Sequence, residues 1–193
     1  MNTRLLPTLV TALLCGGLVS KPLPMQAETP QEWVALGQRV HGAFGSYIAL
    51  GIRIGLDALQ RLHAQRTEVK VTYQSGPKAP CPCVADGIML ATIATPGRGT
   101  LRVMAAPSSQ PVFGIATITD MKTEQTLRYV IPASAQAFLD RCNQYSPIKR
   151  YWAVMKADPS SLYRVTLLRP TKSTKTAPPK SHPLAHAQVQ PSR

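Results

Sequence analysis

The sequence predicts an α+β domain in which helices pack on a mixed sheet built mainly from consecutive antiparallel strands. Apolar residues recur at helical spacing in the first third of the chain, whereas alternating or β-branched runs dominate the part that follows. The short connection between two of these runs, residues 121–124, is typical of a hairpin and therefore of antiparallel pairing.

The N-terminal part of the domain is predicted to be two helices separated by a turn. The first covers residues 30–41, with Thr29 as its N-cap and Pro30 at its start. Residues 41–46 contain two glycines, and each would cost a helix interior about 1 kcal/mol, so we expect a turn there. The second helix covers residues 47–62, where large apolar side chains form one broad face.

Gly51 and Gly55 form a patch of small residues on this second helix. Such a patch lets another element approach the backbone closely. We expect the sheet to pack against it, and a homodimer formed through the patch is the alternative.

Strands and short helices are predicted to alternate along the rest of the domain. We expect strands at residues 67–73, 100–106, 112–119, 125–131 and 163–168. We expect helices at residues 86–94, 132–141 and 148–155.

Both ends of the chain have a composition that differs from the domain. Arg4 precedes an apolar run over residues 5–19, and a cleavage point is plausible after Ala27, so residues 1–27 are predicted to be a signal peptide. An uncleaved anchor and lipidation at Cys15 are the alternatives. Residues 170–193 form a basic, Pro-rich tail with few large apolar residues, which is typical of disorder. The domain therefore covers residues 28–169, and a periplasmic or secreted location is expected.

The chain is strongly basic, with a formal net charge of +13. This charge favours anionic partners. Basic and aromatic residues are not interleaved, so the sequence does not indicate specific binding of nucleic acid. After removal of the signal peptide, no remaining segment is long and apolar enough to span a membrane.

Three cysteines remain in the predicted domain: Cys81, Cys83 and Cys142. An oxidising compartment would pair two of them. A Cys81–Cys83 bridge would close a very small ring around Pro82, so Cys81 with Cys142 is the favoured disulfide and would leave Cys83 free.

Two segments of the chain read HGAFGSYIALG (residues 41–51) and CVADGIMLATIATPGR (residues 83–98). Together they resemble the FmdE-like family of proteins related to formylmethanofuran dehydrogenase. That family opens its domain with His-Gly-His-x-Cys-Pro-Gly-x-x-x-Gly, and residues 41–51 of this chain occupy that place. Its second pattern is Cys-x-x-Asp-(Gly/Ala)-Ile-x-x-x-Thr-Gly-(Ala/Cys)-Thr-x-Gly-Lys. It is matched by Cys83, Asp86, Gly87, Ile88, Thr92, Ala94, Thr95 and Gly97, with Arg98 in place of the lysine.

The resemblance implies a soft-metal site built from the turn histidines, the turn cysteine and the cysteine before the aspartate. Thiolate and imidazole ligands suit zinc or another soft transition metal. The chain keeps His41 and Cys83, but Ala43 and Gly45 stand where the family has ligands. Cys81 would supply a third ligand if it is not in a disulfide.

Asp86 and Arg98 are the other candidate site residues. Asp86 would orient His41 from behind, unless it only caps the first turn of its helix. Arg98, between Gly97 and Gly99, would bind an anion with its guanidinium and the neighbouring backbone N–H groups, unless it simply forms a tight turn.

Three classes of function remain open. The first is an exported domain that binds a soft metal, or a metal-bearing or anionic ligand, through this depleted site. The second is a non-catalytic scaffold or partner-binding protein that has lost the site, and the third is an enzyme with Cys83 as nucleophile and His41 as base. A disulfide between Cys83 and either other cysteine would remove the metal thiolate and favour the second class.

Overall fold

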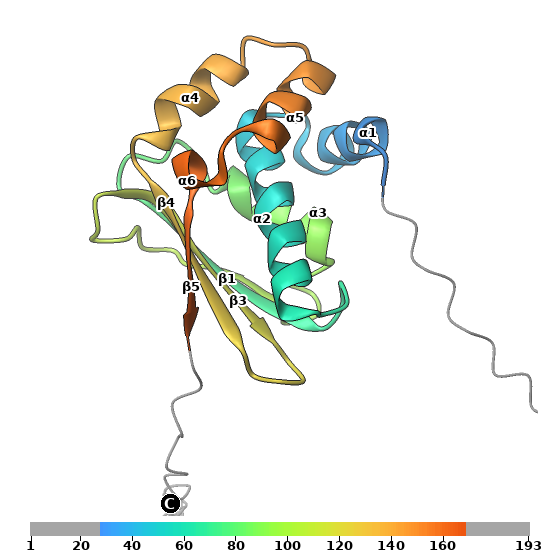
Figure 1. The fold of residues 1–193 in the computed structure, drawn as a ribbon, viewed down its shortest axis with the longest axis vertical. Coiled ribbons are helices and arrows are strands. Elements are labelled where there is room, and N and C mark those ends of the chain that lie inside the picture. Colours follow the sequence, from blue (N-terminus) through green and yellow to red (C-terminus); the bar gives the residue numbers. More distant parts are fainter. Residues whose placement is uncertain (1–27, 169–193) are drawn as a thin grey trace, which may run out of the picture.

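The structure, a computed structural model, describes residues 28–168 and confirms the predicted α+β class. Five strands form one sheet in the order β2-β1-β3-β4-β5, in which β1 and β2 are parallel and the other pairs are antiparallel. Helices gather on one side of this sheet (Figure 1). The predicted signal peptide (residues 1–27) and the predicted tail (residues 170–193) lie outside the described residues. Within residues 28–168, no helix meets the length and hydropathy needed to cross a bilayer.

The elements follow one another along the chain with short connections. The helices are α1 (Pro30–His41), α2 (Ser46–Leu62), α3 (Cys83–Thr92), α4 (Ala135–Cys142), α5 (Pro147–Lys156) and α6 (Pro159–Leu162). The strands are β1 (Val69–Ser75), β2 (Leu101–Val103), β3 (Val112–Asp120), β4 (Thr126–Pro132) and β5 (Arg164–Leu168).

Local sequence explains where the first helices begin and end. Thr29 caps α1 through a reciprocal capping box with Glu32, and Gly42 ends it in the left-handed region at φ 85°. The turn that follows leads into α2, which begins at Ser46. The predicted helix–turn–helix is therefore confirmed.

The small-residue patch of α2 packs against α3. A Cβ atom added at Gly51 would lie 2.1 Å from the carbonyl oxygen of Val84 and 2.8 Å from the Cα of Gly87. A Cβ atom added at Gly55 would lie 2.6 Å from the Cβ of Ala91. The expectation that the sheet packs on this patch is therefore wrong, because the matching small residue Gly87 lets two helix backbones touch instead.

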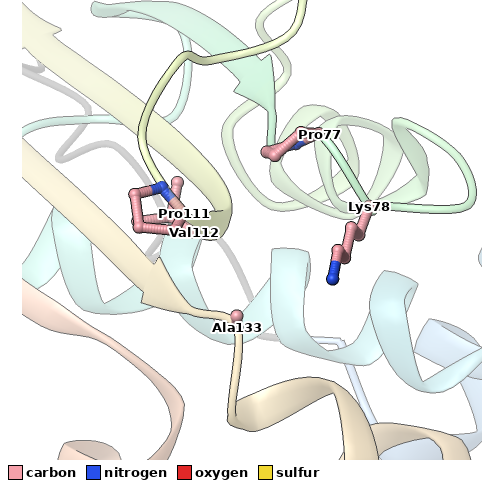
Figure 2. A pocket seen from close by; sticks show the side chains of 5 residues that line it. All are labelled: Pro77, Lys78, Pro111, Val112 and Ala133. Atoms are coloured by element: carbon pink, nitrogen blue, oxygen red, sulfur yellow. The ribbon is translucent and has the colours of Figure 1, made fainter.

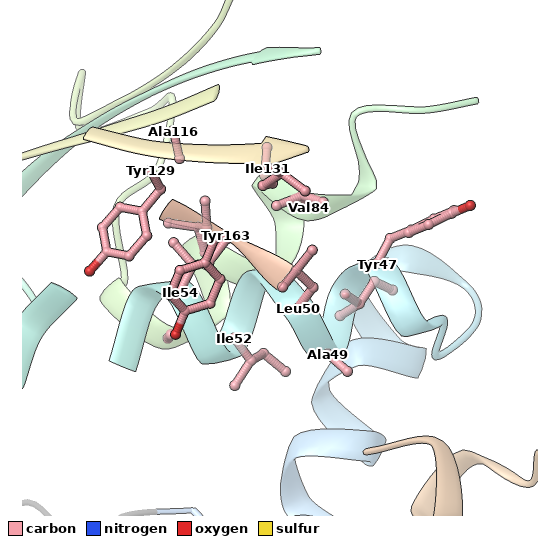
Figure 3. Close-up of a cluster of buried hydrophobic side chains, with 14 of the residues drawn as sticks. Tyr47, Ala49, Leu50, Ile52, Ile54, Val84, Ala116, Tyr129, Ile131 and Tyr163 are labelled. Carbon is pink, nitrogen blue, oxygen red and sulfur yellow. The ribbon is translucent and has the colours of Figure 1, made fainter. Parts of the chain in front are cut away.

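One hydrophobic core joins the helices to the sheet. Leu50 and Ile54 of α2 belong to the same buried cluster as Ala116, Tyr129 and Ile131 of the sheet (Figure 3). Strand β1 alternates strictly between buried and exposed positions over residues 69–73. One face of the sheet is thus covered by helices, which is the arrangement that alternating strands predict.

Two predicted elements that flank the candidate site have different bounds in the structure. Helix α3 starts at Cys83 rather than at residue 86, so both cysteines of the Cys-Pro-Cys segment lie at its beginning. Strand β2 covers three residues instead of the predicted seven, because it is an edge strand that pairs only with β1.

Candidate functional site

Helices α1 and α3 meet at a histidine–aspartate pair. His41 is the last residue of α1, and Asp86 lies in the first turn of α3. The His41 Nδ1 atom lies 2.7 Å from the Asp86 Oδ2 atom, and the two side chains are 30% and 37% exposed. The predicted contact between Asp86 and His41 is present. It engages the Nδ1 atom of the ring, so Nε2 is the ring nitrogen that remains available.

Cys81 and Cys83 form a disulfide at the start of α3. Their Cα atoms are 5.3 Å apart, which is within the range of ordinary disulfides. The chain enters α3 through a turn at Pro82, where the Ala85 N–H donates to the Pro82 carbonyl at 2.8 Å. This turn brings the two cysteines together, an effect that ring size alone did not reveal.

The predicted Cys81–Cys142 disulfide is therefore wrong. Cys142 is a free, buried thiol at the end of α4. Burial raises the pKa of this thiol, which keeps it in the neutral form. It packs as a small apolar residue of the core.

The predicted metal ligands His41, Cys83 and Cys81 do not fit a metal ion in this form of the protein. Metals bind thiolates, and both sulfurs are bonded to each other. No group of three or more His, Cys, Asp or Glu side chains suited to a metal occurs within residues 28–168. The disulfide therefore leaves His41 and Asp86 as a pair without sulfur ligands.

Arg98 directs its side chain to carbonyl oxygens of the protein. Its guanidinium donates to the carbonyl oxygens of Ile93 at 3.2 Å and Thr67 at 3.1 Å. Its backbone N–H donates to the Thr95 hydroxyl, and the Gly99 N–H donates to the Pro96 carbonyl. Because these donors are used within the protein, the loop of Gly97, Arg98 and Gly99 ties the end of α3 to the segment before β1. This favours the tight turn that the sequence left open beside the anion site.

The turn between α1 and α2 is held by a side chain that sequence reasoning missed. Arg150 of α5 donates to the carbonyl oxygens of Phe44, Cys142, Asn143 and Tyr145. Burial lowers its pKa from the usual arginine value. No local signal points to this role, because Phe44 and Arg150 are 106 residues apart in sequence.

Asn143 completes the same junction. Its side-chain oxygen accepts a hydrogen bond from the Ser46 N–H at 2.9 Å, which satisfies a free donor at the start of α2. Nearby, the Tyr47 hydroxyl donates to Asp140. Burial and this carboxylate raise the pKa of Tyr47 well above its usual value. The turn that carries Ala43 and Gly45 is thus held by hydrogen bonds from Asn143 and Arg150.

Two pockets of the described region lie elsewhere. One, of about 120 Å³, is lined by Pro77, Lys78, Pro111, Val112 and Ala133 (Figure 2). Another, of about 220 Å³, is lined by Arg53, Leu56, Asp57, Gln60, Met155, Pro159 and Tyr163. Neither is lined by His41, Asp86 or the disulfide, and the histidine–aspartate pair is partly exposed at the surface.

Comparison with known proteins agrees with the resemblance seen in the sequence. No curated protein matches the chain. The family model described as "FmdE, Molybdenum formylmethanofuran dehydrogenase operon" matches residues 40–160. This match includes the turn, the disulfide, Asp86 and the whole run from β1 to α5, and on this basis the chain belongs to the FmdE family.

Proposed function

We propose that this chain is a non-catalytic, partner-binding member of the FmdE family, in which a disulfide stands where the resemblance places a metal thiolate. The observation that carries the proposal is the Cys81–Cys83 bond. It joins Cys83, the cysteine of the family pattern, to the nearest thiol that could have replaced a missing ligand.

The remaining polar pair is better suited to structure than to metal binding in this form. His41 and Asp86 link the end of α1 to the start of α3. Ion pairs this exposed contribute about 0–1 kcal/mol to stability, so the pair links the two helix ends but adds little to the free energy of unfolding.

The disulfide also argues against the thiol-enzyme alternative. A nucleophilic cysteine must be a thiolate, and Cys83 has no free thiol in this form. The lack of a free thiol at Cys83 supports a binding protein over an enzyme that uses Cys83 as its nucleophile.

Export to the periplasm or the exterior is part of the proposal. Disulfides persist in oxidising compartments and are rare in the cytosol. A Cys81–Cys83 bond together with the signal-like sequence of residues 1–27 supports this location. Fractionation of cells that produce the full chain tests it.

The second candidate function is a soft-metal site that forms only after reduction. A dithiol reductant would deliver two electrons and two protons to the disulfide and become a disulfide itself, leaving two thiols at Cys81 and Cys83. The contact between His41 Nδ1 and the Asp86 carboxylate favours this candidate, because metal-bound histidines usually donate the N–H of their other ring nitrogen to such an acceptor. Two thiolates and the His41 Nε2 atom would suit zinc or another soft transition metal.

Zinc titration of the full chain, before and after treatment with a phosphine reductant that is then removed, separates the two candidates. We expect the untreated protein to bind no stoichiometric zinc that depends on His41. The variant His41→Asn tests that dependence, and His63→Asn is the matched control, because His63 is another exposed histidine at a helix end and asparagine tolerates its left-handed backbone.

The outcomes of this titration are distinct. Stoichiometric zinc in the untreated protein that is lost in His41→Asn alone would overturn the proposed function. Zinc binding that appears only after reduction, and again only with His41 present, would establish the second candidate. His182 and His186 are present in every sample, so weak binding by the tail does not affect the comparison.

A further inference from the structure

We propose that the outer face of the sheet binds an acidic protein partner, an inference that rests on the proposed partner-binding function and names its surface. The outer face is defined here by Lys70, Thr72, Arg102, Thr117, Arg128 and Arg164. It is the side of the sheet opposite the helices, which gather on the other side (Figure 1).

Strand register places these residues on one face. Thr72 pairs with Arg102 on one side and with Thr117 on the other, and Thr117 pairs with Arg128. Their neighbours along the strands, such as Val71 and Tyr129, are buried in the core. Because side chains alternate along a strand, residues flanking these buried positions must point outward.

Charge on this face has one sign. The five strands contain four cations, Lys70, Arg102, Arg128 and Arg164, and the register puts all four on the outer face. The only acid in the strands is Asp120, which is 3% exposed and accepts hydrogen bonds from the turn after β3. Within residues 28–168, none of the four cations forms an ion pair.

The cations are spaced for an extended partner. Arg128 and Arg164 are diagonal neighbours on adjacent strands, about 7–8 Å apart. Arg102 and Arg128 are three strands apart, or about 14 Å at the backbone. Thr72 and Thr117 lie between them and supply hydroxyl donors. Carboxylates of an extended partner could therefore form ion pairs with the cations and accept hydrogen bonds from the threonines.

One end of the face is already covered by the protein. The loop between β2 and β3 lies there, since Gln74 donates to the Ala106 carbonyl and Arg128 to Gln110. Ile115 is only 8% exposed although it points outward. The loop therefore limits a partner to the part of the face around Lys70, Arg102 and Arg164.

The positive charge of the outer face indicates which kind of molecule could bind there. Residues 1–27 and 169–193 contain no Asp or Glu, so neither end of this chain complements the face. A second copy would present the same positive charge and be repelled. The outer face has no aromatic side chain on which bases could stack, because Tyr73 and Tyr129 are buried on the other side. An acidic protein segment is the occupant that fits.

Two double variants of equal charge test the surface. Arg102→Gln with Arg164→Gln removes two exposed cations from the uncovered part of the outer face. Lys149→Gln with Lys156→Gln removes two from α5, where each lies over an exposed ring. The probe is fluorescent poly-L-glutamate, with a single-stranded oligonucleotide of matched charge for comparison. We expect the first variant to lower affinity for polyglutamate roughly tenfold, because it removes two charge-assisted contacts, and the second to lower it less than about threefold.

An equal loss in both variants would overturn the proposal, since it would show that net charge alone drives binding. Tighter binding of the oligonucleotide, with the loss confined to the outer-face variant, would overturn the choice of a protein occupant. If the first variant fails to fold, Lys70→Gln with Arg164→Gln gives the same test. A negative result in this binding test would not change the disulfide or the outcome of the zinc titration. The outer-face proposal and the proposed function can therefore be refuted independently.

Discussion

Gly51→Ala is expected to destabilise the protein by at least about 2 kcal/mol. The added Cβ atom would lie 2.1 Å from the Val84 carbonyl oxygen and 2.8 Å from both the Gly87 Cα and the Ile88 nitrogen, all backbone atoms of α3. Backbone cannot move aside as a flexible side chain can, and overpacking of this kind costs about 1–3 kcal/mol or more. The gain of about 1 kcal/mol in helix propensity does not offset it. Urea unfolding followed by circular dichroism measures the effect.

Gly97→Ala is the matched control. Nothing lies within 4 Å of the position that its Cβ would take. Its free energy of unfolding should stay within about 0.5 kcal/mol of the parent, as for other surface changes. Equal stability of Gly51→Ala and Gly97→Ala would contradict the close packing of α2 on α3.

Arg150→Met is expected to cost about 3 kcal/mol and to loosen the turn between α1 and α2. The variant keeps an apolar stem but removes the donors to four carbonyl oxygens, among them those of Phe44 and Asn143. Hydrogen bonds to charged groups contribute about 1.5–3 kcal/mol each, and water replaces part of this at a half-buried position. Urea unfolding gives the energy, and amide exchange over residues 42–46 reports the turn.

Two further variants show whether the geometry of Arg150 matters. Arg150→Lys should recover only part of the loss, because an ammonium group cannot reach carbonyls in several directions at once. Arg141→Met, at an exposed position of α4, should be almost neutral. A fully stable Arg150→Lys would show that charge alone holds the turn and would contradict the account of the junction.

Much of the fold could be predicted from local sequence signals. Pro30 with Thr29, the glycines of the turn and the alternation in β1 each act within a few residues, and the elements they predict are present. The hairpin between β3 and β4 follows from its short connection in the same way. These features are set by backbone preferences and by the spacing of apolar residues, which a single sequence displays directly.

The site was harder to predict because its contacts depend on how distant elements meet. The Cys81–Cys83 disulfide follows from the turn at Pro82. The small size of the ring that it closes had instead favoured a bond between Cys81 and Cys142. Arg98 looked like an anion ligand because its glycine neighbours are visible in sequence, but its carbonyl partners Ile93 and Thr67 are fixed only by the fold. The contact of Asp86 with His41 could be predicted because the resemblance to the FmdE family brought their two segments together.

The most direct test of the account is the pairing of the cysteines in the full chain purified without reductant. Alkylation under denaturing conditions followed by peptide mapping should find Cys81 and Cys83 unmodified, in one peptide two hydrogens lighter than its reduced form, and Cys142 alkylated. Alkylation of both Cys81 and Cys83 before any reduction would contradict the account. It would restore two thiols at the start of α3, the helix whose Asp86 contacts His41, and return the metal site to first place.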